Sequence, residues 1–290
     1  MNRVKLLLAG AFESSRLNQA LLRAEARLLH PYLRAINYHD VAPSMAASFE
    51  TQLQFYAEHF HPVTYRDLLE LHEGRWPHEK PGLIISFDDG LRSHALVAAP
   101  LLEKYGFPGW FMVPAAFPDW TEESRSETFA RDHDLEYETE GLPDRRCVLS
   151  WEELRALDMR HVIGCHSMSH RRLGEHLDES ELEYEIVGAK ARLEEQLGHE
   201  VPVFAWIGGE EWAYSASAAR TIRRAGFRVS FMTNNAVFRA RGNLLQIQRT
   251  NVEAYYSPAL MRFSLSGFFD LLYTAKRRRV TRLTAQAVAR

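Results

Sequence analysis

Cysteine is scarce in this sequence, which has only Cys147 and Cys165 among its 290 residues. Two cysteines are too few for a disulfide framework, and they do not form the Cys-x-x-Cys spacing of a structural metal site. We therefore expect a reducing compartment. An excess of positive charge is also absent, since the formal net charge is −3. The composition therefore gives no reason to expect a nucleic-acid partner.

Long hydrophobic runs are absent as well. No stretch of eighteen apolar residues occurs, so no helix is expected to span a membrane. The N-terminus is similar to a secretory signal, because Arg3 and Lys5 precede the apolar stretch 6–12. That stretch is at the short limit for a signal and ends at Glu13. We predict a cytoplasmic protein, with export as the alternative.

The sequence does contain an ordinary globular composition, with 46% hydrophobic and 25% charged residues, and a regular alternation of two patterns. Short apolar runs typical of buried strands alternate with segments that have apolar residues at helical spacing. The expected strands are 35–38, 82–87, 110–113, 161–165, 202–206, 228–232 and 244–247. The expected helices are 14–30, 48–60, 65–74, 92–104, 151–158, 178–197, 215–225 and 258–273.

Strands that alternate with helices imply parallel pairing with right-handed crossovers. We predict an α/β fold, a single (β/α) barrel of about seven strands over 35–273. An N-terminal helical extension (1–34) precedes the barrel, and a basic tail (274–290) follows it. Residues 117–148 interrupt the alternation with a long acidic segment. A segment of this length is either disordered or functional.

The ends of several predicted strands carry polar or aromatic side chains. In (β/α) barrels, catalytic groups gather at the carboxyl ends of the strands. We therefore expect these side chains to converge on one face of the barrel: His39, Asp88, Asp89, His166 and Trp206.

The stretch SFDDG (86–90) places two carboxylates directly after a buried strand. A metal ion bound by Asp89 would neutralise one charge and leave Asp88 to take a proton from water. Gly90 allows the tight backbone turn that brings both side chains to the site. We expect Asp88 to be ionised, because a neighbouring cation favours its charged form. The alternative is that the pair caps a helix or a turn.

The stretch CHSMSH (165–170) contains two histidines four residues apart. On one helical turn, the imidazoles of His166 and His170 would face the same way, as a pair of metal ligands requires. Two histidines and one carboxylate leave coordination positions open, which is typical of a catalytic site. A surface or core histidine pair is the alternative.

These two stretches, with Leu173 after the second, resemble the signature motifs of the polysaccharide deacetylase family (carbohydrate esterase family four). The resemblance covers roughly residues 35–270. It implies a deformed (β/α) barrel that removes acetyl from an N-acetylated sugar. It also implies one divalent metal ion, with zinc as the expected metal, held by Asp89, His166 and His170, with Asp88 as the general base.

Two departures from the family pattern lead to further predictions. The family supplies its general acid as a histidine in a C-terminal Leu-x-His segment, but this chain has no histidine after His199. The segment 36–40 is similar to the Tyr-His segment of circularly permuted members, so we predict His39 as the acid; a structural histidine is the alternative. Gly208 stands where the family has a tyrosine whose backbone N–H contacts the oxyanion. We predict that Gly208 serves the same role.

Three further residues are predicted to bind substrate. Trp206 and Trp212 are placed to stack on a sugar ring, with core packing as the alternative for Trp206. Arg249 lies in a segment that resembles one near the end of some family members and would orient Asp88 electrostatically; a surface salt bridge is the alternative.

The predicted function is metal-dependent hydrolysis of the acetamide of an N-acetylated carbohydrate in surface-polysaccharide or lipopolysaccharide biosynthesis. The alternatives are hydrolysis of another small amide or an O-acetyl ester, and a catalytically silent glycan-binding barrel. The basic cluster 276–282 would allow peripheral contact with anionic lipid, and a solvated tail is the alternative.

Overall fold

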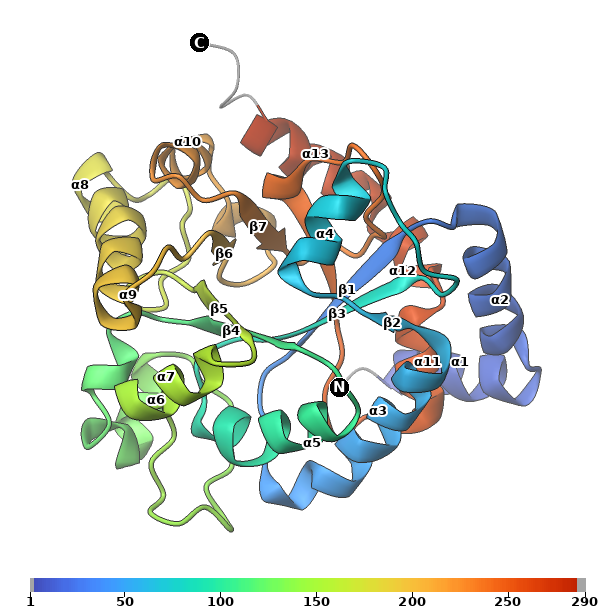
Figure 1. The fold of residues 1–290 in the computed structure, drawn as a ribbon, viewed down its shortest axis with the longest axis horizontal. Coiled ribbons are helices and arrows are strands. Elements are labelled where there is room, and N and C mark those ends of the chain that lie inside the picture. The colour runs from blue at the N-terminus through green and yellow to red at the C-terminus, as the bar shows by residue number, and fades with distance from the viewer. Residues whose placement is uncertain (1–2, 286–290) are drawn as a thin grey trace.

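Seven parallel strands close into a barrel at the centre of the computed structural model, which describes residues 3–285 (Figure 1). The eighth strand, β2, pairs with β3 outside the closed ring. The strands are β1 (Leu33–Tyr38), β2 (His61–Pro62), β3 (Gly82–Phe87), β4 (Gly109–Val113), β5 (Val162–Cys165), β6 (Val203–Ala205), β7 (Val229–Met232) and β8 (Ile247–Asn251).

The pairing of β1 with β3 closes the barrel. This pairing runs from Leu33 opposite Gly82 to Tyr38 opposite Phe87, and the other edge of β1 pairs with β8. Every pairing between named strands is parallel. The predicted α/β barrel of about seven strands is confirmed.

Helices surround this barrel (Figure 1). They are α1 (Arg3–Ser14), α2 (Leu17–Leu29), α3 (Ala46–His59), α4 (Tyr65–His72), α5 (Ala99–Lys104), α6 (Glu127–Asp132), α7 (Trp151–Asp158), α8 (Glu179–Leu182), α9 (Ala189–Leu197), α10 (Ala216–Arg224), α11 (Pro258–Leu265), α12 (Phe268–Leu272) and α13 (Thr274–Ala285). Within residues 3–285, none of them has the length and apolar character needed to cross a bilayer.

Alternate residues of each strand face opposite sides of the barrel wall. One apolar cluster fills the barrel interior and includes Ile84, Trp110 and Phe231. The residues between them in the strands, such as Ile85 and Phe111, belong to the larger cluster under the helices. The same alternation determines which polar side chains point into the barrel at its carboxyl end.

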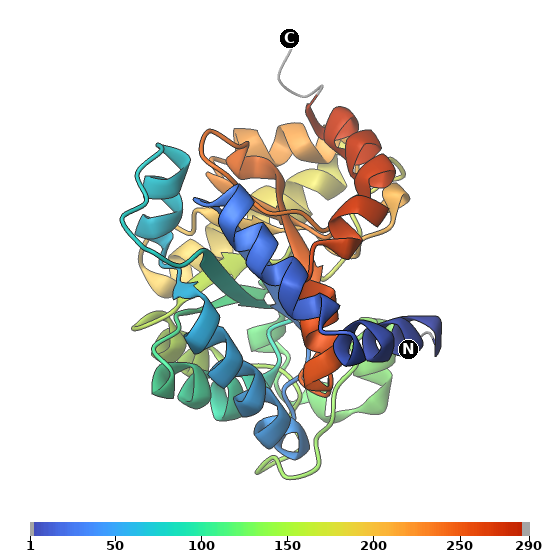
Figure 2. The ribbon, with the colours of Figure 1, turned by 90° about the vertical axis from the view of Figure 1, so that its right-hand side faces the viewer.

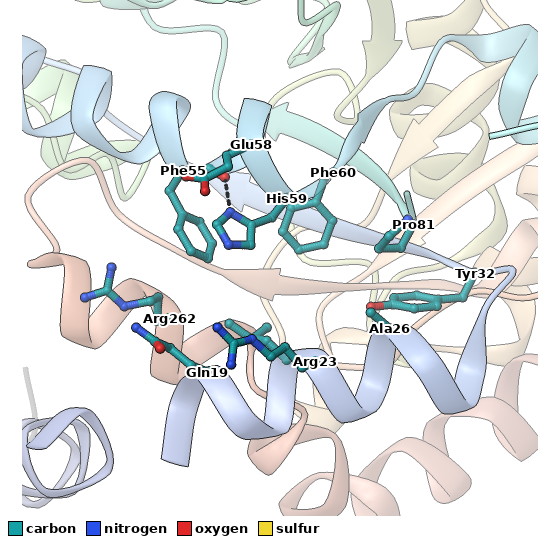
Figure 3. Close-up of a pocket in the computed structure, with 11 residues that line it drawn as sticks. Gln19, Arg23, Ala26, Tyr32, Phe55, Glu58, His59, Phe60, Pro81 and Arg262 are labelled. Carbon is teal, nitrogen blue, oxygen red and sulfur yellow. Dashed lines mark hydrogen bonds between the residues drawn. The ribbon is translucent and has the colours of Figure 1, made fainter. Parts of the chain in front are cut away.

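The N-terminal helices lie on the outside of the barrel, next to α11 and α12 (Figures 1 and 2). Arg34 on β1 is fully buried and binds the carboxylates of Glu25 on α2 and Asp270 on α12, at 2.8 and 3.0 Å. A groove of about 380 Å³ runs between α2 and α3, with Phe55 and Phe60 on one side and Arg23 on the other (Figure 3). Among the described residues, it shares no lining residue with the cavity at the carboxyl end of the barrel.

Several element boundaries differ from those that the sequence predicts. The expected helix 14–30 is preceded by a separate helix, α1, and the chain turns between them at Arg16, which has φ 58°. The expected helix 258–273 is divided by Gly267, whose φ of 75° ends α11 and begins α12. The last strand is Ile247–Asn251 rather than 244–247, where a 3-10 turn (Leu244–Gln246) precedes it. The first twelve residues of the expected basic tail form α13, which packs against α10.

Candidate active site

Asp88 and Asp89 follow β3 at the carboxyl end of the barrel, as the sequence predicts, and both are buried. The backbone turns sharply here, because Asp89 and Gly90 have φ of 74° and 62°. A Cβ atom at Gly90 would lie 3.0 Å from Cγ1 of Val113, so the turn needs glycine for its φ and for the lack of space. The turn directs the two neighbouring carboxylates to different partners.

The carboxylate of Asp89 lies close to both predicted histidines, His166 and His170. Its Oδ1 lies 3.6 Å from Nε2 of His166 and 3.0 Å from Nε2 of His170. All three ligand atoms lie within 4.8 Å of one another. Burial alone would raise the pKa of Asp89, but its interactions with the facing histidines, above all His170, hold that pKa well below its usual range.

The hydrogen bonds of the two histidines test whether this group fits a cation. Nδ1 of His166 lies 2.9 Å from the carbonyl oxygen of Ala205, and Nδ1 of His170 lies 2.7 Å from that of His133. A carbonyl only accepts, so each Nδ1 carries the proton, and in the neutral ring Nε2 is a lone pair that faces Asp89. The two Nε2 lone pairs and the Asp89 carboxylate converge, and with neutral rings none of the three groups can donate a proton to another, so the arrangement fits a divalent metal ion. The carbonyls of Ala205 and His133 fix the orientation of the two rings.

The local conformation of the histidine pair is not the predicted helical turn. Residues 166–170 form a nonhelical turn in which Ser167 and His170 both have φ of 62°. Glu185, from the π-helical segment Glu183–Gly188, accepts hydrogen bonds from the backbone N–H groups of Met168 and Ser169 at 3.1 and 3.0 Å. Hydrogen bonds to the buried glutamate therefore stabilise the turn in place of helical hydrogen bonds. The two histidines face the same way because of this turn and not because of a helical repeat.

A second group with metal-ligand chemistry in the described part of the chain consists of His61, Asp67 and His78. The rings of His61 and His78 stack with centroids 3.4 Å apart and an interplanar angle of 14°. The ligand atoms of this group also lie within 4.8 Å of one another, but its three residues are only partly buried, whereas Asp89 and His166 are buried. This group is therefore a useful comparison for the site around Asp89.

Asp88 is paired with Arg249. The guanidinium Nη1 donates to Oδ1 at 2.6 Å and Nη2 donates to Oδ2 at 2.7 Å. Burial raises the pKa of Asp88, but the Arg249 charge outweighs it and lowers the pKa below the usual value. Asp88 is therefore an ionised acceptor at neutral pH, as predicted, and Arg249 is the neighbouring cation, in the electrostatic role that the sequence analysis gave it.

Arg249 contacts Asp88, as its predicted electrostatic role requires, and it is not among the described residues that line the cavity. Ile247 belongs to the cluster inside the barrel, and Arg249, two residues further along β8, points to the same side. It is completely buried and also donates to Oγ of Ser86 at 3.1 Å. Its position is that of a residue that orients Asp88.

His39 follows β1 and lines the same cavity as Asp89, His166 and His170. Its Nδ1 lies 2.9 Å from Oε1 of Glu253, and its side chain is about one-third exposed. Burial lowers the pKa of His39, but the Glu253 carboxylate raises it more strongly, to about 10. The imidazolium is therefore a charged donor that faces the cavity.

Glu253 is a functional candidate that the sequence analysis missed. It follows β8, the strand that pairs with β1. Pairing of the first and last strands brings together residues that are 214 positions apart. Only knowledge of barrel closure would have identified it.

The catalytic cavity has a volume of about 310 Å³ and an acidic lining. Beyond Asp88 and Asp89 it is lined by the carboxylates of Asp134, Glu136, Glu210 and Glu253, with Arg172 as the one arginine or lysine among the described lining residues. Asp134 and Glu136 belong to the acidic segment 117–148, which also supplies the His133 carbonyl to His170. That segment is thus part of the site.

A sequence model of the polysaccharide deacetylase family matches residues 76–230. The chain belongs to the polysaccharide deacetylase family. The matched region contains both aspartates of the SFDDG stretch and both histidines. No match was found among curated proteins.

Solved deacetylase structures share the fold of this family member. Streptococcus pyogenes deacetylase PplD, in complex with acetate, is 19% identical over 79% of this chain and 96% of its own, with a TM-score of 0.62. The BpsB deacetylase domain from Bordetella bronchiseptica is 15% identical over 77% and 96%, with a TM-score of 0.60. IcaB from Ammonifex degensii is 19% identical over 82% and 97%, with a TM-score of 0.56.

The remaining predicted site residues differ in where they lie. Gly208 lines the cavity with φ 73°, and a Cβ there would lie 2.5 Å from Oε2 of Glu210. Trp206 is only 2% exposed and packs against Tyr214 in the core, so the core alternative holds and it does not reach the cavity. Trp212 is 59% exposed and lies 5.5 Å from the guanidinium of Arg172, which lines the cavity. Trp212 is therefore placed at the rim.

Proposed function

We propose that this deacetylase is a metal-dependent de-N-acetylase that hydrolyses the acetamide of an N-acetylated sugar. The observation that carries the proposal is the convergence of Asp89, His166 and His170, with both Nδ1 protons directed to carbonyls. Two imidazole nitrogens and one carboxylate are the ligand set of many catalytic zinc sites, so zinc is the expected ion. When bound, the ion would polarise the acetyl carbonyl and lower the pKa of water.

The residues around this group supply proton transfers on two sides of the cavity. Asp88, held ionised by Arg249, accepts the proton of the attacking water as general base. The backbone N–H of Gly208 is proposed to donate to the oxyanion, and no side chain is needed for that role. His39, held as an imidazolium by Glu253, gives its proton to the departing sugar amine.

The acidic lining supports a substrate without negative charge at the reacting sugar. Four carboxylates besides the aspartate pair line the cavity, and each would repel a phosphate or uronate placed there. A neutral acetamido sugar or an amino sugar fits this lining. The proposal has three further parts. The reaction belongs to surface-polysaccharide or lipopolysaccharide biosynthesis, the protein is cytoplasmic, and a circular permutation explains the position of His39.

Acetate release tests the proposal directly. Purified protein is incubated with free, nucleotide-linked and lipid-linked N-acetyl sugars and with an O-acetylated sugar as comparison. We expect acetate from at least one N-acetylated sugar, and a product lighter by one acetyl group. Acetate from the O-acetylated sugar alone would identify an esterase, and no acetate from any substrate would favour a glycan-binding barrel.

A further inference from the structure

The helix α1 exposes an unusual amount of apolar surface. Leu6, Leu7 and Leu8 are 42%, 74% and 36% exposed, and of the helix only Ala9 is buried. Single exposed leucines are normal on soluble proteins, but adjacent ones mark interaction surfaces. This helix is therefore the first part of an unpartnered apolar face.

The neighbouring helix α12 extends the same face. Leu271 and Leu272 are 78% and 64% exposed. Phe12 of α1 packs on Phe268 of α12 with ring centroids 5.7 Å apart. Both helices lie on the side of the molecule that faces the viewer in Figure 2. We call the five leucines of these two helices the leucine face: Leu6, Leu7, Leu8, Leu271 and Leu272.

The charges around the leucine face are mostly positive. The helices α1, α2, α12 and α13 together contain nine lysines and arginines but three carboxylates. Each carboxylate is paired with an arginine from another element: Glu13 with Arg262, and Glu25 and Asp270 with Arg34. Six arginines of these helices are exposed at the surface, and one of them, Arg279, is paired with Glu211: Arg3, Arg23, Arg27, Arg278, Arg279 and Arg282.

We propose that the leucine face docks on an anionic lipid surface. An interfacial helix combines leucines that enter the headgroup region with flanking cations that attract anionic lipids, and stable attachment needs both. A second copy of this chain is a poorer partner, because a two-fold interface would bring the same cations of both copies together. None of the helices within residues 3–285 is suited to crossing the bilayer, so the attachment is peripheral.

A series of contacts leads from α1 to the cavity. Nζ of Lys5 on α1 donates to the hydroxyl of Tyr256 at 3.3 Å. The preceding residue, Tyr255, is exposed and lines a depression that continues from the catalytic cavity along His39 and Glu253. Docking through α1 would therefore bring the cavity close to the bilayer. If the proposed de-N-acetylase function holds, a glycan carried on lipid is the substrate class that this orientation serves.

Vesicle co-sedimentation tests docking without any need for catalysis. The full chain is mixed with vesicles of phosphatidylcholine alone, or of phosphatidylcholine with phosphatidylglycerol. We expect binding to the anionic vesicles that weakens with salt, and clearly weaker binding to phosphatidylcholine. The double variant Leu7→Glu/Leu271→Glu should bind on the order of tenfold or more weakly.

The matched control is Met159→Glu, which changes an apolar residue that is 82% exposed at the end of α7 and should bind like the wild type. Three results would overturn the proposal: no binding of the wild type to anionic vesicles, equal binding of the double variant, or a dimer in light scattering that Leu7→Glu dissociates. Acetate release from a soluble substrate reports separately on the proposed function, since the leucines lie outside the cavity.

Discussion

Asp88 and Asp89 are adjacent in sequence, and their different surroundings give them different chemistry. Asp88 receives two hydrogen bonds from a buried arginine, whereas Asp89 faces two imidazole lone pairs. The left-handed φ of Asp89 separates the two carboxylates. The proposed roles of base and metal ligand therefore arise from one backbone turn.

Asp88→Asn separates these roles. Asparagine keeps the size of the side chain but cannot accept a proton, so acetate release should fall by about 10²–10⁴-fold. Metal affinity should change little, because Asp89 is the ligand. Parallel measurements of kcat and of bound metal check this, and unchanged turnover would remove Asp88 as the base.

Glu253→Gln tests the proton donor. The Glu253 carboxylate raises the pKa of His39 to about 10, so the imidazolium is present below that pH and is lost as the pH rises through it. Without the carboxylate, the pKa of His39 falls towards 6.5 and the alkaline limb of kcat/KM moves to lower pH. Each unit of that fall reduces the protonated fraction above it about tenfold. A pH–rate profile measures the shift.

The control is Glu138→Gln, which changes an exposed carboxylate in the adjoining depression. It should leave the alkaline limb of kcat/KM in place. An unshifted limb in Glu253→Gln would show that His39 is not the titrating acid.

At the scale of elements, strand ends could be predicted from the sequence, but the conformations of the turns could not. The apolar runs located β3 and β5, and the polar residues that follow them do reach one cavity. The helical interpretation of 166–170 failed because Glu185, from the next helical segment of the chain, accepts the hydrogen bonds of that turn. Spacing alone does not distinguish a helical turn from a turn held by tertiary contacts.

Gly90→Ala tests the turn after β3. An alanine at φ 62° costs about 1–2 kcal/mol, and its Cβ would also press on Val113. We expect a lower unfolding free energy and weaker metal binding, because Asp89 is displaced. Gly106→Ala is the matched control, since its φ is 74° and no atom lies within 4 Å of the added Cβ. It should lose similar backbone energy but keep its metal affinity. Equal metal affinity in both variants would contradict a role of the turn in placing Asp89.

At the scale of the whole molecule, barrel closure pairs the first strand, β1, with the last strand, β8, and the predictions from the sequence did not use this pairing. The barrel and the group of Asp89, His166 and His170 could be predicted because the strand pattern and the two motifs can each be recognised in short stretches of sequence. Glu253 was missed because its partner, His39, lies 214 positions away in the sequence. Arg249 was matched to Asp88, 161 positions away, only through the family resemblance. The alternation of β8 would have placed Arg249 inside the barrel, but the expected strand ended before it.

Arg34→Met tests how the N-terminal helices are attached. The substitution leaves Glu25 and Asp270 without their buried partner, so unfolding free energy should fall by about 3–5 kcal/mol. Urea unfolding measures it. Arg66→Met removes an ion pair of an arginine that is 85% exposed and should change stability by less than about 1 kcal/mol. Similar losses in both variants would mean that the buried cluster does not fasten α2 and α12.

The most direct test of the central claim is the metal content of the purified chain, measured together with acetate release before and after chelation. We predict one tightly bound zinc ion per chain, lost in His166→Ala but retained in His61→Ala, and hydrolysis that stops on chelation and returns when zinc is restored. Retention of the ion by His166→Ala, or undiminished hydrolysis by metal-free protein, would contradict the proposed catalytic site.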